Sequence, residues 1–131
     1  MSETHQIEQK GLQILGAWLA GQHRTCERSH NQTFDLIVDG EYAELKTKAK
    51  GWESFDFLSL TSRQKDSLGA ELKRIFLVLN VSDPENAQVC EIDAVELMRC
   101  KSNTIVHYEW NKGAIRELCV KRNEDQSAYR T

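Results

Sequence analysis

The stretch FDLIVDGEYAELKTK, residues 34–48, predicts a β-hairpin. At its centre, Asp39-Gly40 flanked by apolar, β-prone residues is one of the strongest local signals for a two-residue hairpin loop. If these two residues form the loop, counting outward along both strands places Asp35 directly opposite Glu44. Residues opposite each other in an antiparallel pair share one face of the sheet, with Cβ atoms about 5 Å apart. The sequence therefore predicts two carboxylates side by side.

The predicted hairpin has one charged face and one apolar face. Lys46 lies two residues after Glu44 and so shares its face. The apolar face consists of Phe34, Leu36, Val38, Ala43 and Leu45. Opposed carboxylates repel each other, and a bound metal ion would remove that cost. These residues alone equally fit a solvated face, which is the commoner case, with Lys46 in a surface ion pair that contributes about 0 to 1 kcal/mol.

Length and composition predict one globular domain over residues 1–131, since 40% of the chain is apolar and 28% is charged. No apolar run approaches the length of a membrane span, and the first ten residues, MSETHQIEQK, lack the pattern of a signal peptide. We expect a cytoplasmic protein that is not bound to a membrane. The four cysteines form no CxxC pair, which favours reduced thiols over disulfides or a zinc ribbon.

The net charge of −3 does not favour nucleic-acid binding, because most domains that bind nucleic acids are basic. The charge is uneven, however: residues 83–96 are acidic and residues 99–122 are rich in Lys and Arg. Such asymmetry permits a cationic patch on an acidic protein.

Periodicity predicts the order of the remaining elements. We expect a helix over 5–20, a strand over 24–29, the hairpin, an aromatic loop over 49–57, a helix over 60–74, strands over 74–81 and 87–92, a short helix over 94–99 and a strand over 103–110. Residues 113–122 fit a helix or a strand, and 124–131 fit a frayed tail. The aromatic loop either covers the sheet, which we favour, or stacks on bases. This order predicts an α/β fold in which helices flank a mixed central sheet.

Together these residues resemble the PD-(D/E)XK nuclease superfamily, in the small form similar to archaeal Holliday-junction resolvases and restriction-endonuclease-like domains. The resemblance covers about residues 5–93 and rests on the helix, the hairpin with its Asp, Glu and Lys, and the helix that follows. It implies a restriction-endonuclease-like core of the order α-β-β-β-α-β. Phe34 stands where the family usually has proline, which is a common departure.

The resemblance also implies roles for individual residues. Asp35 and Glu44 would bind Mg²⁺, with Mn²⁺ as a substitute, and the Leu45 carbonyl would add a ligand. Lys46 would position or activate the attacking water. Glu8 matches a further acid that many members carry in the first helix, although an acid there also favours the helix dipole.

Gln64 matches a glutamine that some members carry on the second helix. Thr61 and Gln64 also form the T-x-x-Q pattern of a capping box, which we favour as the reason for this residue. The tyrosine that often accompanies the catalytic glutamine is replaced here by Leu68. Gln64 is therefore a candidate with two explanations.

The function that follows is a metal-dependent endonuclease acting on DNA, including branched or structured DNA, and working as a homodimer. An alternative is a nuclease fold that serves as a binding or regulatory module with little or no catalysis, for example in phage-host defence or counter-defence. A third is a structural protein in which the hairpin charges are incidental.

Overall fold

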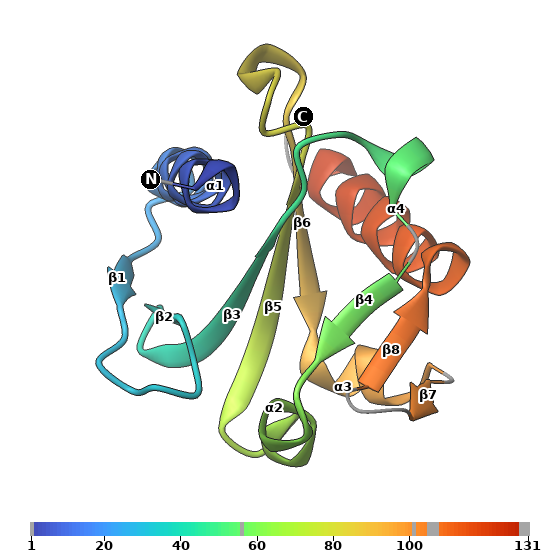
Figure 1. The fold of residues 1–131 in the computed structure, drawn as a ribbon. Coiled ribbons are helices and arrows are strands. Elements are labelled where there is room, and N and C mark those ends of the chain that lie inside the picture. The colour runs from blue at the N-terminus through green and yellow to red at the C-terminus, as the bar shows by residue number, and fades with distance from the viewer. Residues whose placement is uncertain (1, 56, 101, 105–107, 129–131) are drawn as a thin grey trace.

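The computed structural model describes residues 2–55, 57–100, 102–104 and 108–128 and shows two β-sheets with helices packed around them (Figure 1). The helices are α1 (Glu3–Ala20), α2 (Ser62–Ser67), α3 (Ala94–Met98) and α4 (Lys112–Ala128), with 3-10 turns η1 (Trp52–Ser54) and η2 (Pro84–Asn86). The strands are β1 (Cys26–Arg28), β2 (Leu36–Val38), β3 (Glu41–Thr47), β4 (Phe57–Leu60), β5 (Leu72–Leu79), β6 (Gln88–Asp93), β7 (Asn103–Thr104) and β8 (Tyr108–Asn111).

The larger sheet has five strands in the order β1-β2-β3-β5-β6, and the smaller has three in the order β4-β8-β7. Strands β3 and β5 run parallel, whereas the other pairs in the larger sheet are antiparallel. This confirms the expected mixed central sheet and the order helix, three strands, helix, strand. Strand β4 is an addition to that order: it begins at the last residue of the expected loop and ends at the first residue of the expected second helix.

The hairpin has the predicted register. Val38 pairs with Glu41, and the two loop residues between them, Asp39 and Gly40, have φ angles of 52° and 82°. Two positive φ angles define the turn type whose twist matches that of the flanking strands. The Asp39 carboxylate also accepts a hydrogen bond from the Thr25 N–H at 3.0 Å, which ties the turn to β1.

Arg24 links the same turn to the opposite edge of the sheet. Its guanidinium pairs with Asp39 at 2.7 Å and, through two hydrogen bonds of 2.8 Å, with Glu91 on β6. Glu91 is buried, and Arg74 on β5 also contacts it at 3.2 Å. A buried carboxylate needs such partners, because an isolated buried charge is very costly.

Helix α1 covers one face of the larger sheet, as its pattern predicts. Leu15 and Leu19 are fully buried and pack in one cluster with Phe76 and Val78 of β5 and with Leu36 of β2. The side chain of Ser2 caps the start of the helix by accepting the His5 N–H. We call the side of the sheet that carries this cluster the α1 face.

The other side, which carries Glu44, is called here the carboxylate face. Its cluster contains Ile75 and Leu77 of β5, Leu58 of β4, Trp110 of β8 and Ile115 of α4. The second helix, α2, reaches this face near Glu44, where Gln64 contacts the carboxylate. The second sheet and α4 supply most of the cover, and both come largely from the third of the chain outside the resemblance.

The second helix is also shorter than the periodicity indicates. It ends at Ser67, Gly69 turns the chain with a φ of 86°, and Leu72 already belongs to β5. Leu68 and Leu72 lie four residues apart, the spacing of an inward stripe on the expected helix. Both are buried, but a turn and a strand bury them instead.

Phe34 departs from the expected position on the hairpin, whereas Phe55 lies where it is expected from the sequence. Phe34 was placed on the apolar face of the hairpin, but its ring packs on Tyr42, 5.0 Å between centroids, within the cluster on the carboxylate face. The reason is that β2 begins only at Leu36, so the alternation of the strand does not extend back to residue 34. Phe55 is 1% exposed and covers the sheet, as favoured.

The C-terminal elements resolve the remaining ambiguity. Residues 113–122 lie in α4, and the short helix capped by Asp93 is present, with the Asp93 side chain accepting the N–H groups of Val95 and Glu96. The expected frayed tail over 124–131 overlaps the end of α4, and its last three residues lie outside the described part.

All four cysteines are free. None of the described helices combines the length and apolarity that crossing a bilayer requires.

Candidate active site

Glu44 lies in the middle of β3, between β2 and β5, and is only 4% exposed. Its Oε1 accepts the backbone N–H of Asp35 at 3.3 Å, and its Oε2 accepts the side-chain amide of Gln64. The carboxyl group is thus held by donors on both sides. Burial within a sheet and two hydrogen bonds fix its position.

Asp35 lies immediately before β2 and is exposed. Its Oδ2 accepts the backbone N–H of Leu45 at 3.1 Å. Asp35 and the segment 44–45 therefore hold each other by two bonds: the Asp35 N–H donates to the Glu44 carboxylate, and the Leu45 N–H donates to the Asp35 carboxylate. This confirms that the two acids face each other across the hairpin, and the exposed member keeps the pair open to solvent.

The pair is electrostatically unusual. Burial, hydrogen bonding to the Asp35 side chain and the charge of Asp35 raise the pKa of Glu44 from 4.5 to about 8, although Lys46 acts in the opposite direction. A carboxyl group resists ionisation when it is desolvated beside a second negative charge. A positive charge placed between the two acids would offset both the desolvation of the Glu44 carboxylate and its repulsion by Asp35.

Lys46 provides one cation on the same face. Its Nζ lies 3.6 Å from Glu44 Oε2, and its side chain is 29% exposed. The three residues of the predicted pattern are therefore brought together, with the ammonium group at the solvent side of the buried acid.

Leu45 presents its backbone to Asp35. The N–H and C=O groups of one strand residue point toward the same neighbouring strand, and the Leu45 N–H is directed to Asp35. The carbonyl oxygen of Leu45 therefore faces the same edge as the Asp35 carboxylate. Asp35, Glu44 and this carbonyl could form an all-oxygen site, which suits Mg²⁺, an ion that typically takes one or two carboxylates and keeps several waters.

Gln64 serves the cap of α2 and contacts Glu44 at the same time. Its Oε1 accepts the Thr61 N–H at 3.1 Å while the Thr61 hydroxyl accepts the Gln64 N–H at 3.2 Å, so the favoured capping box is present. Its Nε2 donates to Glu44 and to the Thr33 carbonyl, the latter at 3.2 Å. The two explanations are compatible because they use different atoms of the amide.

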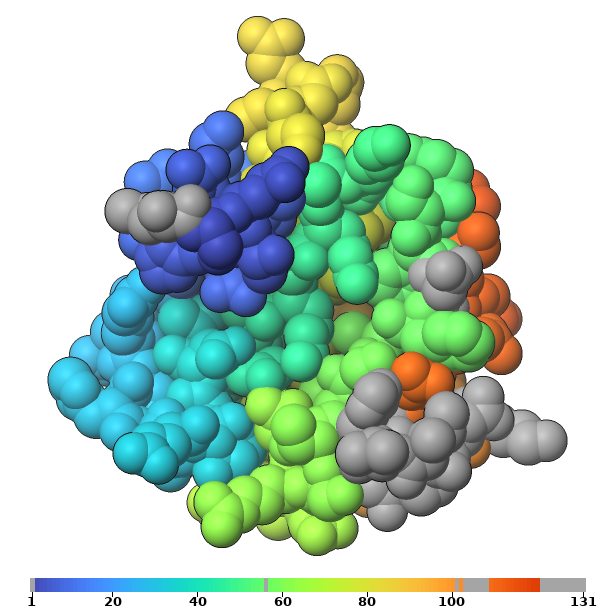
Figure 2. Space-filling model, in the orientation of Figure 1, coloured from blue at the N-terminus to red at the C-terminus, as the bar shows by residue number. Residues whose placement is uncertain are grey.

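Glu8 lies on α1 and is exposed, at the edge of a pocket of about 330 Å³ that Asp35 and Leu45 also line. Figure 2 shows α1, in dark blue, directly above the cyan segment of β1 and β2 on this surface. Among the described residues no three His, Cys, Asp or Glu side chains gather closely enough to hold a metal ion. Glu8 is therefore a neighbour of the acid pair across a pocket rather than a third member of a preformed cluster.

The sequence did not single out Arg28, which lines the same pocket as Glu8 and Asp35 and adds a cation to it. The register could have indicated it, because Arg28 pairs with Leu36, the residue after Asp35. Two successive antiparallel pairs thus bring β1 to the site.

The fold and the site define a restriction-endonuclease-like α/β architecture that carries an opposed acid pair and a lysine on adjacent strands. In its fold the chain is similar to a Holliday junction resolvase, Hjc of the archaeal hyperthermophile Archaeoglobus fulgidus. The TM-score is 0.55 with 14% sequence identity, over 83% of this chain and 87% of the resolvase. Neither a protein-family model nor a curated protein sequence matches the chain.

Proposed function

We propose that this protein is a metal-dependent endonuclease of the PD-(D/E)XK type that hydrolyses phosphodiester bonds in DNA, with branched DNA as its substrate class. The observation that carries the proposal is the reciprocal bonding of Asp35 and Glu44, with Lys46 at 3.6 Å from the buried acid. The fold shared with a Holliday junction resolvase supports it, and so does the cost of holding two carboxylates together without a cation.

In this proposal Asp35, Glu44 and the Leu45 carbonyl hold Mg²⁺, or Mn²⁺ in its place. The ion neutralises the phosphodiester, lowers the pKa of a bound water and stabilises charge on the leaving oxygen. Lys46 offers its ammonium group to orient the attacking water. Gln64 holds Glu44 in place, and Glu8 on the far side of the pocket is available to bind a water of the ion.

The proposal includes a homodimer, which would supply two sites for two strands of a branched substrate. It also includes an intracellular location, which agrees with DNA as the substrate and with four free cysteines.

The test is cleavage of a four-way DNA junction and of linear duplex DNA in the presence of Mg²⁺. Asp35→Ala and Lys46→Ala should each lower the cleavage rate at least about a hundredfold, the scale of effect of removing a charge-stabilising group. Asp66→Ala is the matched control, because Asp66 is an exposed acid at the end of α2 outside the site. Unchanged cleavage in both site variants would eliminate the assignment.

The second candidate function is a binding or regulatory module without catalysis, which the net charge of −3 favours. It predicts no cleavage by the wild-type protein with either ion. Calorimetric titration with Mn²⁺ then separates a catalytically silent metal site from incidental charges, because only the former loses binding in Glu44→Gln.

A further inference from the structure

Three lysines follow one another at every second position from the candidate site outward. They are Lys46, Lys48 and Lys50, and we call them the lysine row. Backbone hydrogen bonds tie the segment after β3 to the end of β5 and the residues that follow it, since the Lys48 N–H donates to the Val78 carbonyl at 2.9 Å and the Asn80 N–H donates to the Lys50 carbonyl at 3.0 Å. Side chains two apart on an extended chain point to the same face, so Lys46 and Lys48 lie on the carboxylate face, and the chain bends at residues 49 and 50 before η1.

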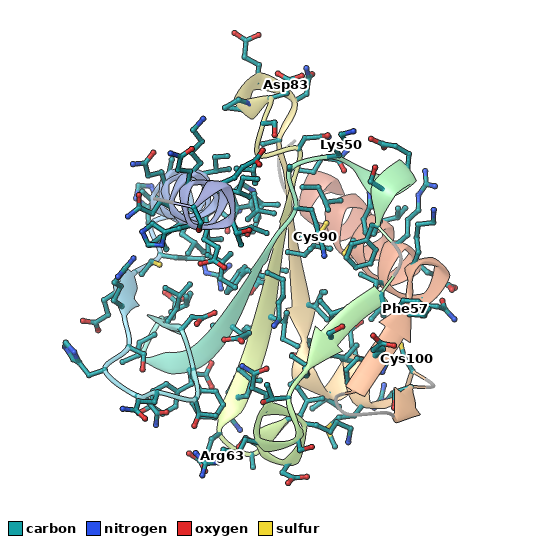
Figure 3. The ribbon with its side chains drawn as sticks, viewed as in Figure 1. Lys50, Phe57, Arg63, Asp83, Cys90 and Cys100 are labelled. Atoms are coloured by element: carbon teal, nitrogen blue, oxygen red, sulfur yellow. The ribbon has the colours of Figure 1, made fainter. Side chains whose placement is uncertain are left out.

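Two observations place the members of the row. The Lys48 ammonium lies 5.8 Å from the centroid of Phe55, a residue of the cluster on the carboxylate face. Figure 3 shows Lys50 at the end of the β3 segment that leads into η1, with Arg63 of α2 at the opposite end of the molecule. The row therefore begins beside Glu44 and leads away from it toward η1.

The outer two lysines do not serve the fold through ion pairs. Lys48 and Lys50 are exposed, and within the described part of the chain neither lies within 4.0 Å of a carboxylate oxygen. Lys46, by contrast, pairs with Glu44. Aligned cations on a protein of net charge −3 create a local positive potential that the overall charge conceals.

We propose that the lysine row binds successive phosphates of one DNA strand and delivers that strand to Asp35 and Glu44. This rests on the proposed nuclease function and adds the path of the substrate. Lys46 and Lys48 are two residues apart on an extended chain, which advances by about 6.6 Å over that step, a distance comparable to the separation of neighbouring phosphates in an extended DNA strand. Lysine is a common phosphate ligand that acts as a point charge and reads no bases, so the row predicts binding without sequence preference.

The test measures the affinity of a fluorescent single-stranded oligonucleotide at several salt concentrations, in EDTA to prevent cleavage. Each phosphate contact contributes about 0.7 to the slope of log K against log salt for single strands. Lys48→Gln and Lys50→Gln should each lower the slope by about 0.7, and the double variant by about 1.4. Lys48→Arg and Lys50→Arg keep the charge and should keep the slope.

The matched control is Lys10→Gln, because Lys10 is an exposed lysine on α1, which packs on the opposite face of the sheet. The lysine row would be overturned if the double variant kept the wild-type salt slope, or if its slope fell only as much as that of Lys10→Gln. Cleavage of a junction with Mg²⁺ by the same preparations separates the two proposals. If the protein cleaves the junction but the salt dependence of DNA binding is unchanged in the Lys48 and Lys50 variants, only the lysine row is refuted. If DNA binding depends on these lysines but the junction is not cleaved, the nuclease function is refuted and the lysine row stands.

Discussion

Replacing Glu44 with glutamine removes an acid whose protonation is coupled to folding. The pKa of Glu44 rises from 4.5 to about 8 in the folded chain, first because of burial and then because of Asp35. The folded state therefore holds the proton more tightly than the unfolded state does. The protonated Glu44 carboxyl group makes its full contribution to the free energy of unfolding below about pH 4.5, and this contribution is lost as the pH rises through about 8.

The size of this loss follows from the two pKa values. At about 1.4 kcal/mol for each unit of pKa, the difference between 4.5 and about 8 sets an upper limit of about 5 kcal/mol. Water that enters the site as the group ionises relaxes part of the penalty, so we expect a loss of about 2 to 4 kcal/mol. Glutamine at position 44 stays neutral and retains an oxygen to accept the Gln64 amide, so the variant should lack this loss.

The assay is unfolding by denaturant between about pH 5 and 9 in EDTA. The difference in unfolding free energy between Glu44→Gln and wild type should increase with pH, because the other ionisable groups are common to both. Glu41→Gln is the matched control, since Glu41 is an exposed glutamate on the same strand. Parallel curves for wild type and Glu44→Gln would refute the account of the buried acid pair.

Three further predictions concern stability and the site. Gln64→Leu should lose about 1 to 3 kcal/mol by removing the side-chain half of the capping box and a donor to Glu44, and calorimetry should show weaker Mn²⁺ binding; unchanged binding would remove Gln64 from the site. Arg24→Met should lose about 3 kcal/mol in denaturant unfolding because it removes one partner of buried Glu91, and a loss below about 1 kcal/mol would contradict the buried pair. Gly40→Ala should lose about 1 kcal/mol at its φ of 82°, and a stabilised variant would show that the turn has another geometry.

The hairpin and the acid pair were predictable because local rules determine them. The dipeptide Asp39-Gly40 specifies a turn, the turn specifies the register, and the register brings Asp35 to Glu44. None of these steps depends on a distant part of the chain. The contact between Gln64 and Glu44 is different, because sequence separation conceals it, and only the family resemblance indicated it.

The elements that cover the carboxylate face could not be predicted from local sequence patterns. Leu68 and Leu72 lie four apart and suit a helical stripe, but the same two residues equally suit burial in a turn and at the start of a strand. Residues 113–122 were ambiguous because their packing partners lie in β6, β8 and β4, which the local pattern does not connect. Tertiary packing decides such segments, and propensity is only a weak guide to them.

The double duty of Gln64 has a consequence for how Glu44 can move. Turning the carboxyl of Glu44 away from its present orientation would break a bond to an amide whose oxygen is already engaged at the start of α2. A glutamate restricted to one rotamer has little side-chain entropy left to lose, a saving of about 1 to 2 kcal/mol when a ligand arrives. The rigidity of a six-residue helix thus prepares a strand residue for binding, and the site should meet its ligand with its geometry already set.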